Sequence, residues 1–362
     1  MQDKTKNKII AIGFICILII IFFINLFTED KQISVAERRK LTEFPKITIK
    51  NITSGKLAED FEKYTVDQFL ARDFFRSVKS FNSTKIFKQK DNNKLFEKDG
   101  AIYKIEYPLN ESNIKKSATK MNEVFDRYLK DNNNVYYSII PDKNYYLEND
   151  DHLKIDYNRL KEIMQNEIKS MQYIDIFNTL TLEDYYKTDI HWKQENLLKV
   201  VNVLQNEMKL NTIEQIKYET KEVGDFYGVY YGQLAKKTQP DKMYILTNKN
   251  IEDCTTYNYE TKNIGKIYDT KTSSDKYDIY LSGAIPLITI ENPNAKEKRE
   301  LLLFRDSFGS SLAPLLLENY SKITLIDLRY ISSKLLNMYI EFENQDVLFL
   351  YSSVVLNQNI LK

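Results

Sequence analysis

The segment YYKTDIHWKQE, residues 185–195, concentrates residue types that carry out acid–base chemistry. It holds His191, one of two histidines in the 362-residue chain, beside Trp192, the only tryptophan. In an extended segment, side chains two residues apart point the same way, so Asp189 can accept the Nδ1–H of His191 while Nε2 acts as a base. Trp192 would then line one side of the site or stack on a sugar face. A structural histidine packed beside a core tryptophan fits the same spacing.

A candidate nucleophile follows an apolar strand near the C-terminus. The segment LLLFRDSFG runs from residues 301–304 to Ser307, and a helix is expected to begin just beyond. Free N–H groups at a helix N-terminus favour developing negative charge, which suits a serine that attacks a carbonyl. A serine at this point is also a common helix cap. As a nucleophile Ser307 needs a base, and His191 is the candidate that can also be oriented by a nearby carboxylate.

Several other chemistries are disfavoured by composition. The other histidine, His152, lies among acids in an expected loop, and neither a second nearby histidine nor a cysteine pair completes a zinc site, so no metal is expected. No phosphate-binding glycine loop or dinucleotide fingerprint is present, so no cofactor is expected. The 52 Lys and Arg nearly balance the 51 Asp and Glu, which argues against a nucleic-acid partner.

The N-terminus predicts a membrane anchor. Three lysines precede an apolar run at residues 9–27, and Glu29 and Asp30 follow it. At ~1.5 Å per residue the run is long enough to cross a hydrocarbon core of ~30 Å. Lysines before the run and acids after it predict a single-pass protein of the cell membrane, with a cytoplasmic N-terminus and an extracellular main domain. The alternative is a signal peptide, cleaved near the SVA of residues 34–36.

Short apolar strands alternate with helical patterns in the remainder of the chain. Strands are expected at residues 135–140, 173–177, 301–304, 323–327 and 347–351. This alternation predicts an α/β fold with a mostly parallel sheet flanked by helices, whose ligands bind beyond the carboxyl ends of the strands. The expected organisation is a tail and transmembrane anchor at 1–30, a stem and helical arm packed on the main domain at 31–110, and a catalytic domain at 111–362 with a β-rich insertion at about 213–290.

These motifs, in this order, resemble the DHHW protein family, which is related to the SGNH-hydrolase-like proteins of alginate O-acetylation. Asp189, His191 and Trp192 match the family's name motif, whose first histidine is replaced here by Ile190. The segments IIPDKNYYL, DFYGVYYGQLAKKTQPD and RDSFGSSLAPLLLENYSKITLIDLRY are also similar to the family, as is the N-terminal region ERRKLTEFPKITIKNITSGKLAEDFEKYTVDQFLARDFFRSVKS. The resemblance covers nearly the whole chain after the anchor.

The resemblance implies an SGNH-hydrolase-like, flavodoxin-like fold and a serine-dependent O-acetyltransferase of cell-surface polysaccharide or exopolysaccharide. Ser307 would accept the acetyl group, with His191 as base and Asp189 orienting it. The N–H of Ser307, with Gly283, would hold the oxyanion. A membrane-bound O-acyltransferase would supply the acetyl group. An esterase that transfers the acetyl group to water, and a non-catalytic polysaccharide-binding or assembly protein, are the alternatives.

A tyrosine-rich segment, FYGVYY at residues 226–231, offers a candidate sugar-binding surface. Tyr230 and Tyr231 can line a glycan groove, because tyrosine combines an apolar ring with a hydroxyl. The core of a buried hairpin is the competing interpretation of the same pattern. Unchanged glycan affinity after Tyr230→Ala and Tyr231→Ala would exclude the groove.

Overall fold

The computed structural model describes residues 2–131, 134–148, 151–210, 216–269 and 275–362. The chain divides into two compact units. The first comprises residues 1–92 and 231–237, and the second comprises residues 93–230 and 238–362. The expectation that residues 31–110 pack on the main domain stays a prediction.

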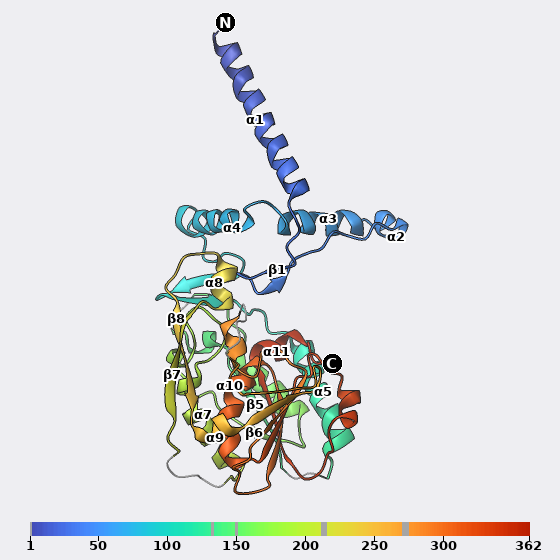
Figure 1. Ribbon diagram of the computed structural model, residues 1–362, viewed down its shortest axis with the longest axis vertical. Coiled ribbons are helices and arrows are strands. Elements are labelled where there is room, and N and C mark those ends of the chain that lie inside the picture. Colours follow the sequence, from blue (N-terminus) through green and yellow to red (C-terminus); the bar gives the residue numbers. More distant parts are fainter. Residues whose placement is uncertain (1, 132–133, 149–150, 211–215, 270–274) are drawn as a thin grey trace. The chain divides into compact units, whose positions relative to one another are not determined.

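The second unit is built on an eight-stranded sheet among the residues that are described (Figure 1). Five strands pair in parallel in the order β13-β12-β14-β5-β6, and β11, β9 and β10 extend the sheet with antiparallel pairings. Their bounds are β5 Val135–Ile140, β6 Gln172–Ile174, β9 Thr255–Asn258, β10 Asn263–Gly265, β11 Leu287–Glu291, β12 Glu300–Arg305, β13 Lys322–Ile326 and β14 Asp346–Ser352. The expected α/β fold with a mostly parallel sheet is therefore confirmed.

Side chains alternate between the two faces of the sheet and build two cores. On β12, Leu301 and Leu303 belong to one apolar cluster, whereas Leu302 and Phe304 belong to the other. Helices α7 (Leu198–Glu207) and α10 (Ser307–Leu316) contribute to the first cluster. Helices α5 (Glu111–Val124), α6 (Tyr157–Glu167) and α11 (Ser353–Gln358) contribute to the second. Because both faces are covered, the strands consist of continuous apolar runs.

The expected insertion contains a hairpin and part of the main sheet. Strands β7 (Glu219–Phe226) and β8 (Asp241–Thr247) pair antiparallel, while β9, β10 and most of β11 join the large sheet. The segment also contains α8 (Val229–Leu234) and α9 (Lys249–Asp253). Residues 213–215 and 270–274 of the expected insertion lie outside the described residues. A second hairpin in this unit, β3 (Leu95–Lys98) with β4 (Ala101–Lys104), precedes the sheet in sequence.

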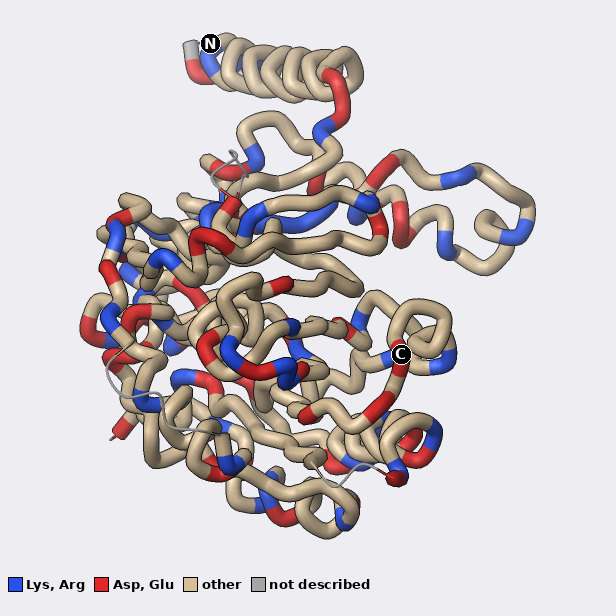
Figure 2. Tube along the Cα trace, turned by 60° about the horizontal axis from the view of Figure 1, so that its bottom comes forward, with Lys and Arg blue, Asp and Glu red and all other residues tan. Residues whose placement is uncertain are grey.

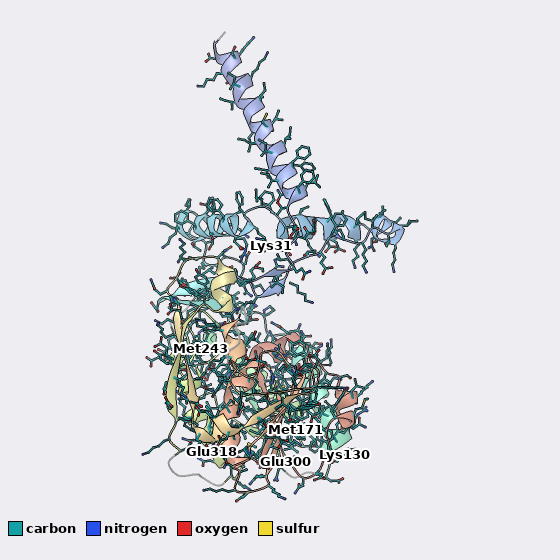
Figure 3. The ribbon with its side chains drawn as sticks, viewed as in Figure 1. Lys31, Lys130, Met171, Met243, Glu300 and Glu318 are labelled. Atoms are coloured by element: carbon teal, nitrogen blue, oxygen red, sulfur yellow. The ribbon has the colours of Figure 1, made fainter. Side chains whose placement is uncertain are left out.

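The first unit begins with the long apolar helix α1 (Gln2–Phe27). Its segment Asp3–Phe27 is long and apolar enough to cross a membrane, and its side chains project into solvent all round the helix (Figure 3). Figure 2 shows that most of α1 carries no charged residue. The unit continues with β1 (Ile33–Ser34), β2 (Arg39–Lys40), α2 (Ile49–Thr53), α3 (Lys56–Asp67) and α4 (Arg72–Phe81).

Candidate active site

Ser307 lies at the carboxyl edge of the parallel sheet, as the first residue of α10 directly after β12. Asp306 caps the helix, because its Oδ1 accepts a hydrogen bond of 3.0 Å from the N–H of Phe308. The other carboxylate oxygen of Asp306 accepts from the N–H of Ser352, at the end of the neighbouring strand β14, at 2.8 Å. Asp306 therefore ties the ends of two parallel strands together beside Ser307, whose side chain remains half-buried.

A hydrogen-bonded chain joins Ser307 to His191 and Asp189. The Nε2 of His191 is 2.7 Å from Ser307 Oγ, and its Nδ1 is 2.6 Å from Asp189 Oδ1. The same Asp189 oxygen accepts from the backbone N–H of His191 at 3.0 Å, which fixes the carboxylate against the imidazole edge. Ser307 and His191 are 116 residues apart in sequence. This geometry is that of a nucleophile, a base and a group that orients the base.

The segment that carries Asp189 and His191 is held by the carboxylate of Asp241, at the start of β8. One oxygen of Asp241 accepts from the backbone N–H of Lys187 at 2.8 Å. The other accepts from both the N–H and the hydroxyl of Thr188, at 2.8 and 2.6 Å. Asp241 is 6 % exposed, so these bonds are shielded from water. They fix the chain immediately before Asp189.

Lys143, just beyond β5, holds the carbonyl groups of the same segment. Its Nζ donates to the carbonyl oxygens of Tyr186, Lys187 and Asp189, at 3.0, 3.2 and 2.9 Å. The ammonium also lies 5.0 Å from the ring centroid of Tyr230. Burial lowers the pKa of Lys143 to about 7. Three donors on one cation thus match three carbonyls of the segment that carries Asp189 and His191.

Gly228 allows a close backbone approach behind Asp189. A Cβ at this position would lie 2.3 Å from both the Cβ of Asp189 and the carbonyl oxygen of Thr188, a distance that side chains do not tolerate. The next residue, Val229, donates its N–H to Asp189 Oδ2 at 2.7 Å. Both oxygens of the Asp189 carboxylate therefore accept hydrogen bonds, and the absence of a side chain at Gly228 makes this possible.

Aromatic rings enclose the imidazole. Tyr277 stacks on His191 with ring centroids 3.9 Å apart, and Phe308 packs at 4.8 Å. The hydroxyl of Tyr277 donates to Ser311 Oγ, which also accepts from Trp192 Nε1; both distances are 2.9 Å. Burial raises the pKa of Tyr277 well above its usual value, so its hydroxyl remains a neutral donor. His191 is thus fixed by stacking as well as by hydrogen bonds.

The binding roles expected for Trp192 and Tyr230 require correction. Trp192 is fully buried, and its Nε1–H donates to Ser311 and to the Phe308 carbonyl, so it supports α10 from inside the core. Tyr230 is 4 % exposed and packs beside Lys143. Neither ring is open to a sugar. Tyr231 is half-buried, and its role in glycan binding stays a prediction.

The structure offers no support for Gly283 as an oxyanion donor. Its N–H donates to the Tyr280 carbonyl at 3.2 Å, within a turn where Gly283 has a φ of +87°. The other expected donor, the N–H of Ser307, lies in the first turn of α10, where helical N–H groups have no carbonyl partner within the helix. The second histidine, His152, stacks on Phe96 with centroids 3.5 Å apart. The described ranges hold no group of three or more residues suited to a metal.

Lys143, Asp241 and Gly228 were not assigned roles from the sequence. Asp241 directly follows Pro240 in TQPD, whereas Lys143 lies two residues after Pro141 in IIPDK, just beyond an all-buried strand. The rule that ligands and catalytic groups gather beyond carboxyl ends of parallel strands would have marked Lys143 as a candidate. No comparable signal marks Gly228, because its importance depends on a close approach to a residue 39 positions earlier.

Comparisons with known proteins show the family and the fold of this chain. The model of the DHHW protein family matches residues 127–326, and the chain therefore belongs to this family. A DHHW family protein from Eubacterium siraeum is 19% identical with a TM-score of 0.62, over 75% of this chain and 95% of that chain. Bacillus cereus PatB1, solved with a sulfonyl adduct, is 20% identical with a TM-score of 0.58, over 74% of this chain and 96% of that chain.

A search of curated proteins found no match. At these identities the likeness to solved structures shows a shared fold. The fold class expected from the sequence, a mostly parallel sheet flanked by helices, is confirmed.

Proposed function

We propose that the protein is a membrane-anchored, serine-dependent O-acetyltransferase that acts on cell-surface polysaccharide or exopolysaccharide outside the cytoplasm. The observation that carries the proposal is the hydrogen-bonded chain from Asp189 through His191 to Ser307. Membership of the DHHW family supports the assignment to this chemistry. The 2.7 Å separation of His191 and Ser307 argues against a purely structural histidine.

The first half-reaction would acetylate the serine. His191 Nε2 takes the proton of the Ser307 hydroxyl while Oγ attacks the carbonyl carbon of an acetyl donor. The tetrahedral oxyanion is stabilised by the N–H of Ser307 at the N-terminus of α10. His191 then gives its proton to the leaving group of the donor, and acetyl-Ser307 remains. Asp189 keeps Nδ1 protonated throughout, because its Oδ1 accepts that proton's hydrogen bond.

The second half-reaction would pass the acetyl group to a sugar. His191 deprotonates a sugar hydroxyl, whose oxygen attacks the acetyl carbonyl, and the proton then returns to Ser307 Oγ as the ester bond to serine breaks. Water in place of the sugar would make the protein an esterase. A membrane-bound O-acyltransferase is the partner that would present the acetyl group. In this scheme the polysaccharide is the acceptor and not the donor.

Helix α1 would hold the protein at the cell membrane. Its apolar length suits a single crossing, and the lysines before it favour a cytoplasmic N-terminus. A cleaved signal sequence passes the same test of length and composition. The N-terminal sequence of the protein purified from membranes distinguishes them: an intact Met1 or Gln2 supports the anchor, and a start near residue 37 contradicts it.

The experiment that tests the activity uses the full chain in detergent with p-nitrophenyl acetate, with and without an oligosaccharide acceptor. Ser307→Ala is compared with Ser321→Ala, a matched half-buried serine outside the site whose hydroxyl donates to the Arg299 carbonyl. Acetylated sugar formed by wild type and Ser321→Ala, and lost in Ser307→Ala, is the expected result. Release of acetate alone with every glycan would identify an esterase. Equal behaviour of all three folded proteins would contradict both catalytic functions.

A sulfonyl reagent gives an independent test of the nucleophile. Sulfonyl fluorides transfer their sulfonyl group to activated hydroxyls with loss of fluoride, and the related PatB1 structure contains a sulfonyl adduct. Phenylmethylsulfonyl fluoride should therefore modify Ser307, as located by peptide mass spectrometry. In His191→Ala the modification should slow, because the hydroxyl then has no base. Unchanged labelling in His191→Ala would show that His191 does not act as the base for Ser307.

A further inference from the structure

Helices α3 and α4 and the turn between them carry aromatic side chains that are exposed to solvent. Phe74 is 64% exposed and Phe81 is 58% exposed, although both are large and apolar. We define the aromatic face as five such residues: Phe61, Phe69, Phe74, Phe75 and Phe81. Exposed apolar patches rich in large side chains mark sites of contact with a partner or a membrane.

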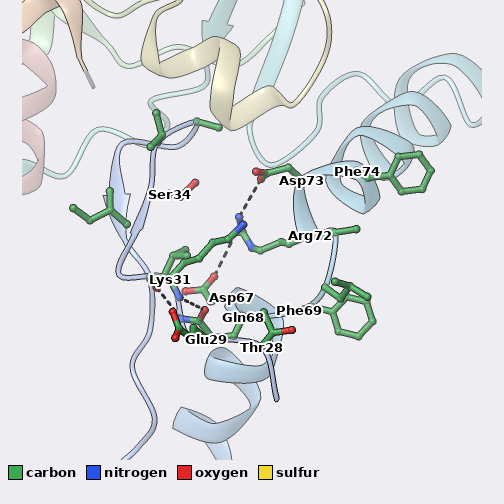
Figure 4. A pocket seen from close by; sticks show the side chains of 16 residues that line it. Thr28, Glu29, Lys31, Ser34, Asp67, Gln68, Phe69, Arg72, Asp73 and Phe74 are labelled. Atoms are coloured by element: carbon green, nitrogen blue, oxygen red, sulfur yellow. Dashed lines mark hydrogen bonds and ion pairs between the residues drawn. The ribbon is translucent and has the colours of Figure 1, made fainter. Parts of the chain in front are cut away.

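Where α3 and α4 meet, their charged side chains form a partly buried ion-pair cluster, whereas Glu59 and Lys63 on α3 remain exposed. Asp67 is 7 % exposed and accepts a two-pronged hydrogen bond from Arg39 at 2.6 and 2.9 Å. Arg72, 14% exposed, pairs with Glu37 at 2.6 Å. Figure 4 shows Phe69 and Phe74 directed away from the ion pair of Arg72 and Asp67. A helix on a water-soluble domain normally buries its apolar stripe, so phenylalanines that are exposed beside a buried ion-pair cluster depart from the usual arrangement.

Hydrogen bonds fix the turn between α3 and α4 at the C-terminal end of α1. The N–H of Leu70 donates to the side-chain oxygen of Asn25, in the last turn of α1, at 2.7 Å. Gln68 makes two hydrogen bonds with the backbone of Lys31, one through its side-chain oxygen and one through its side-chain nitrogen. Figure 1 shows α3 and α4 running across the end of α1 within this unit. The aromatic face is therefore continuous with the end of the apolar helix.

The charge of this segment suits an anionic surface. Residues 46–90 contain ten Lys and Arg against five Asp and Glu, whereas the whole chain has a net charge of only +1. The five acids include Asp67, which is already paired with Arg39, and Glu59, which pairs with Lys63. Exposed lysines beside inserted aromatic rings are the combination by which amphipathic helices bind membranes that contain anionic lipids.

We propose that α3 and α4 lie in the membrane interface, with the aromatic face inserted among the acyl chains and the lysines at anionic headgroups, in the leaflet where α1 emerges. This inference rests on the proposed anchoring by α1 and adds a second attachment to it. A single helix leaves its attached unit free to tilt and rotate, whereas a helix pair in the interface fixes one side of that unit against the bilayer. A lipid surface is favoured over a protein partner by the hydrogen bond from Leu70 to Asn25 of α1 and by the excess of basic residues.

The test places a fluorescent reporter in the aromatic face of the full chain. Phe74→Trp is reconstituted in vesicles of phosphatidylcholine and phosphatidylglycerol in which part of the lipid carries bromine on its acyl chains. The wild type gives the background of the buried Trp192. Tyr330→Trp, an aromatic residue with 48% exposure in the other unit, is the matched control. Quenching of the introduced tryptophan at position 74 by brominated lipid, well above both controls, is the expected result.

Two other outcomes would overturn the proposal in different ways. Blue-shifted emission from position 74 without quenching would mean that a second copy of the chain or another protein covers the face. Retention of the chain on vesicles after an alkaline carbonate wash, with no quenching, would reject the interfacial helices while leaving the anchor intact. Release by the wash would reject the anchor itself. Acetyl transfer is measured in detergent, so its failure is separate from all of these results.

Discussion

The Lys143 ammonium donates a hydrogen bond of 2.9 Å to the carbonyl oxygen of Asp189, the residue that orients the candidate base. Two further carbonyls of the same segment accept from this one group. Lys143 touches no reacting atom in the proposed reaction, so it is a positioning residue. It acts by fixing the backbone from which Asp189 and His191 extend.

Lys143→Met should therefore slow catalysis and loosen the fold. Three buried carbonyls lose their partner, which we expect to lower the free energy of unfolding by about 3 kcal/mol. Displacement of the base should lower kcat by about 10²-fold with little change in KM. Lys242→Met, at an exposed lysine, is the control. Reduced stability with an unchanged kcat would make Lys143 a purely structural residue.

The same lysine predicts a dependence of stability on pH. Burial lowers the pKa of Lys143 to about 7 in the folded protein, against about 10.4 in an unfolded chain. Between these values the unfolded state binds more protons, so the free energy of unfolding should rise with pH, by at most about 1.4 kcal/mol per unit. Below pH 7 the group is charged in both states and contributes no slope.

Denaturant unfolding of wild type and Lys143→Met across pH 7 to 10 checks this. As the pH rises through this window, the free energy of unfolding of wild type should increase relative to that of the variant. A constant difference would show that the buried amine keeps its proton, and would contradict the lowered pKa.

Gly228→Ala should impair activity through steric displacement of Asp189. The added Cβ would lie 2.3 Å from the Asp189 Cβ, so the backbone of one segment must move. We expect kcat to fall by about 10²-fold, because a small misplacement of a catalytic group has effects of this size. Gly265→Ala is the control, since its Cβ meets only the Thr256 side chain, at 3.1 Å. An active Gly228→Ala enzyme would show that the position of Asp189 is not critical.

Trp192→Phe separates a core role from a sugar-binding role. The substitution removes the indole N–H that donates to Ser311 and to the carbonyl of Phe308. The free energy of unfolding should fall by about 1–3 kcal/mol. The KM for an oligosaccharide acceptor should not change, because the ring is fully buried. A raised KM in a variant of unchanged stability would instead support the sugar-binding role that the sequence predicted for Trp192.

The pairing of His191 with Ser307 could be predicted from the sequence for two physical reasons. The chain has only two histidines, and one of them lies two residues after an aspartate. Ser307 follows an apolar strand, and catalytic groups gather where parallel strands end. The small number of histidines and the position of Ser307 at a strand end therefore allowed the pair to be predicted, although the two residues are 116 positions apart.

The structural roles of Lys143 and Trp192 could not be predicted from the sequence in the same way. Lys143 finds its carbonyl partners 43 to 46 residues away, in a segment without regular structure. The burial of Trp192 depends on packing against α10, and the amphipathic pattern of its own segment does not determine it. Sequence periodicity predicts which face of an element is buried, but close approaches between irregular segments arise only from the complete fold.

The proposed serine mechanism requires acetyl-Ser307 as its intermediate. Full-length wild type, Ser307→Ala and Ser321→Ala are each exposed briefly to p-nitrophenyl acetate, quenched in acid, and digested for peptide mass spectrometry. We expect an acetyl group on Ser307 in wild type and Ser321→Ala, and its disappearance from wild type when an acceptor oligosaccharide is added before the quench. If the peptide with Ser307 remains unmodified while acetate is released at the same rate by all three proteins, the proposed serine mechanism is wrong.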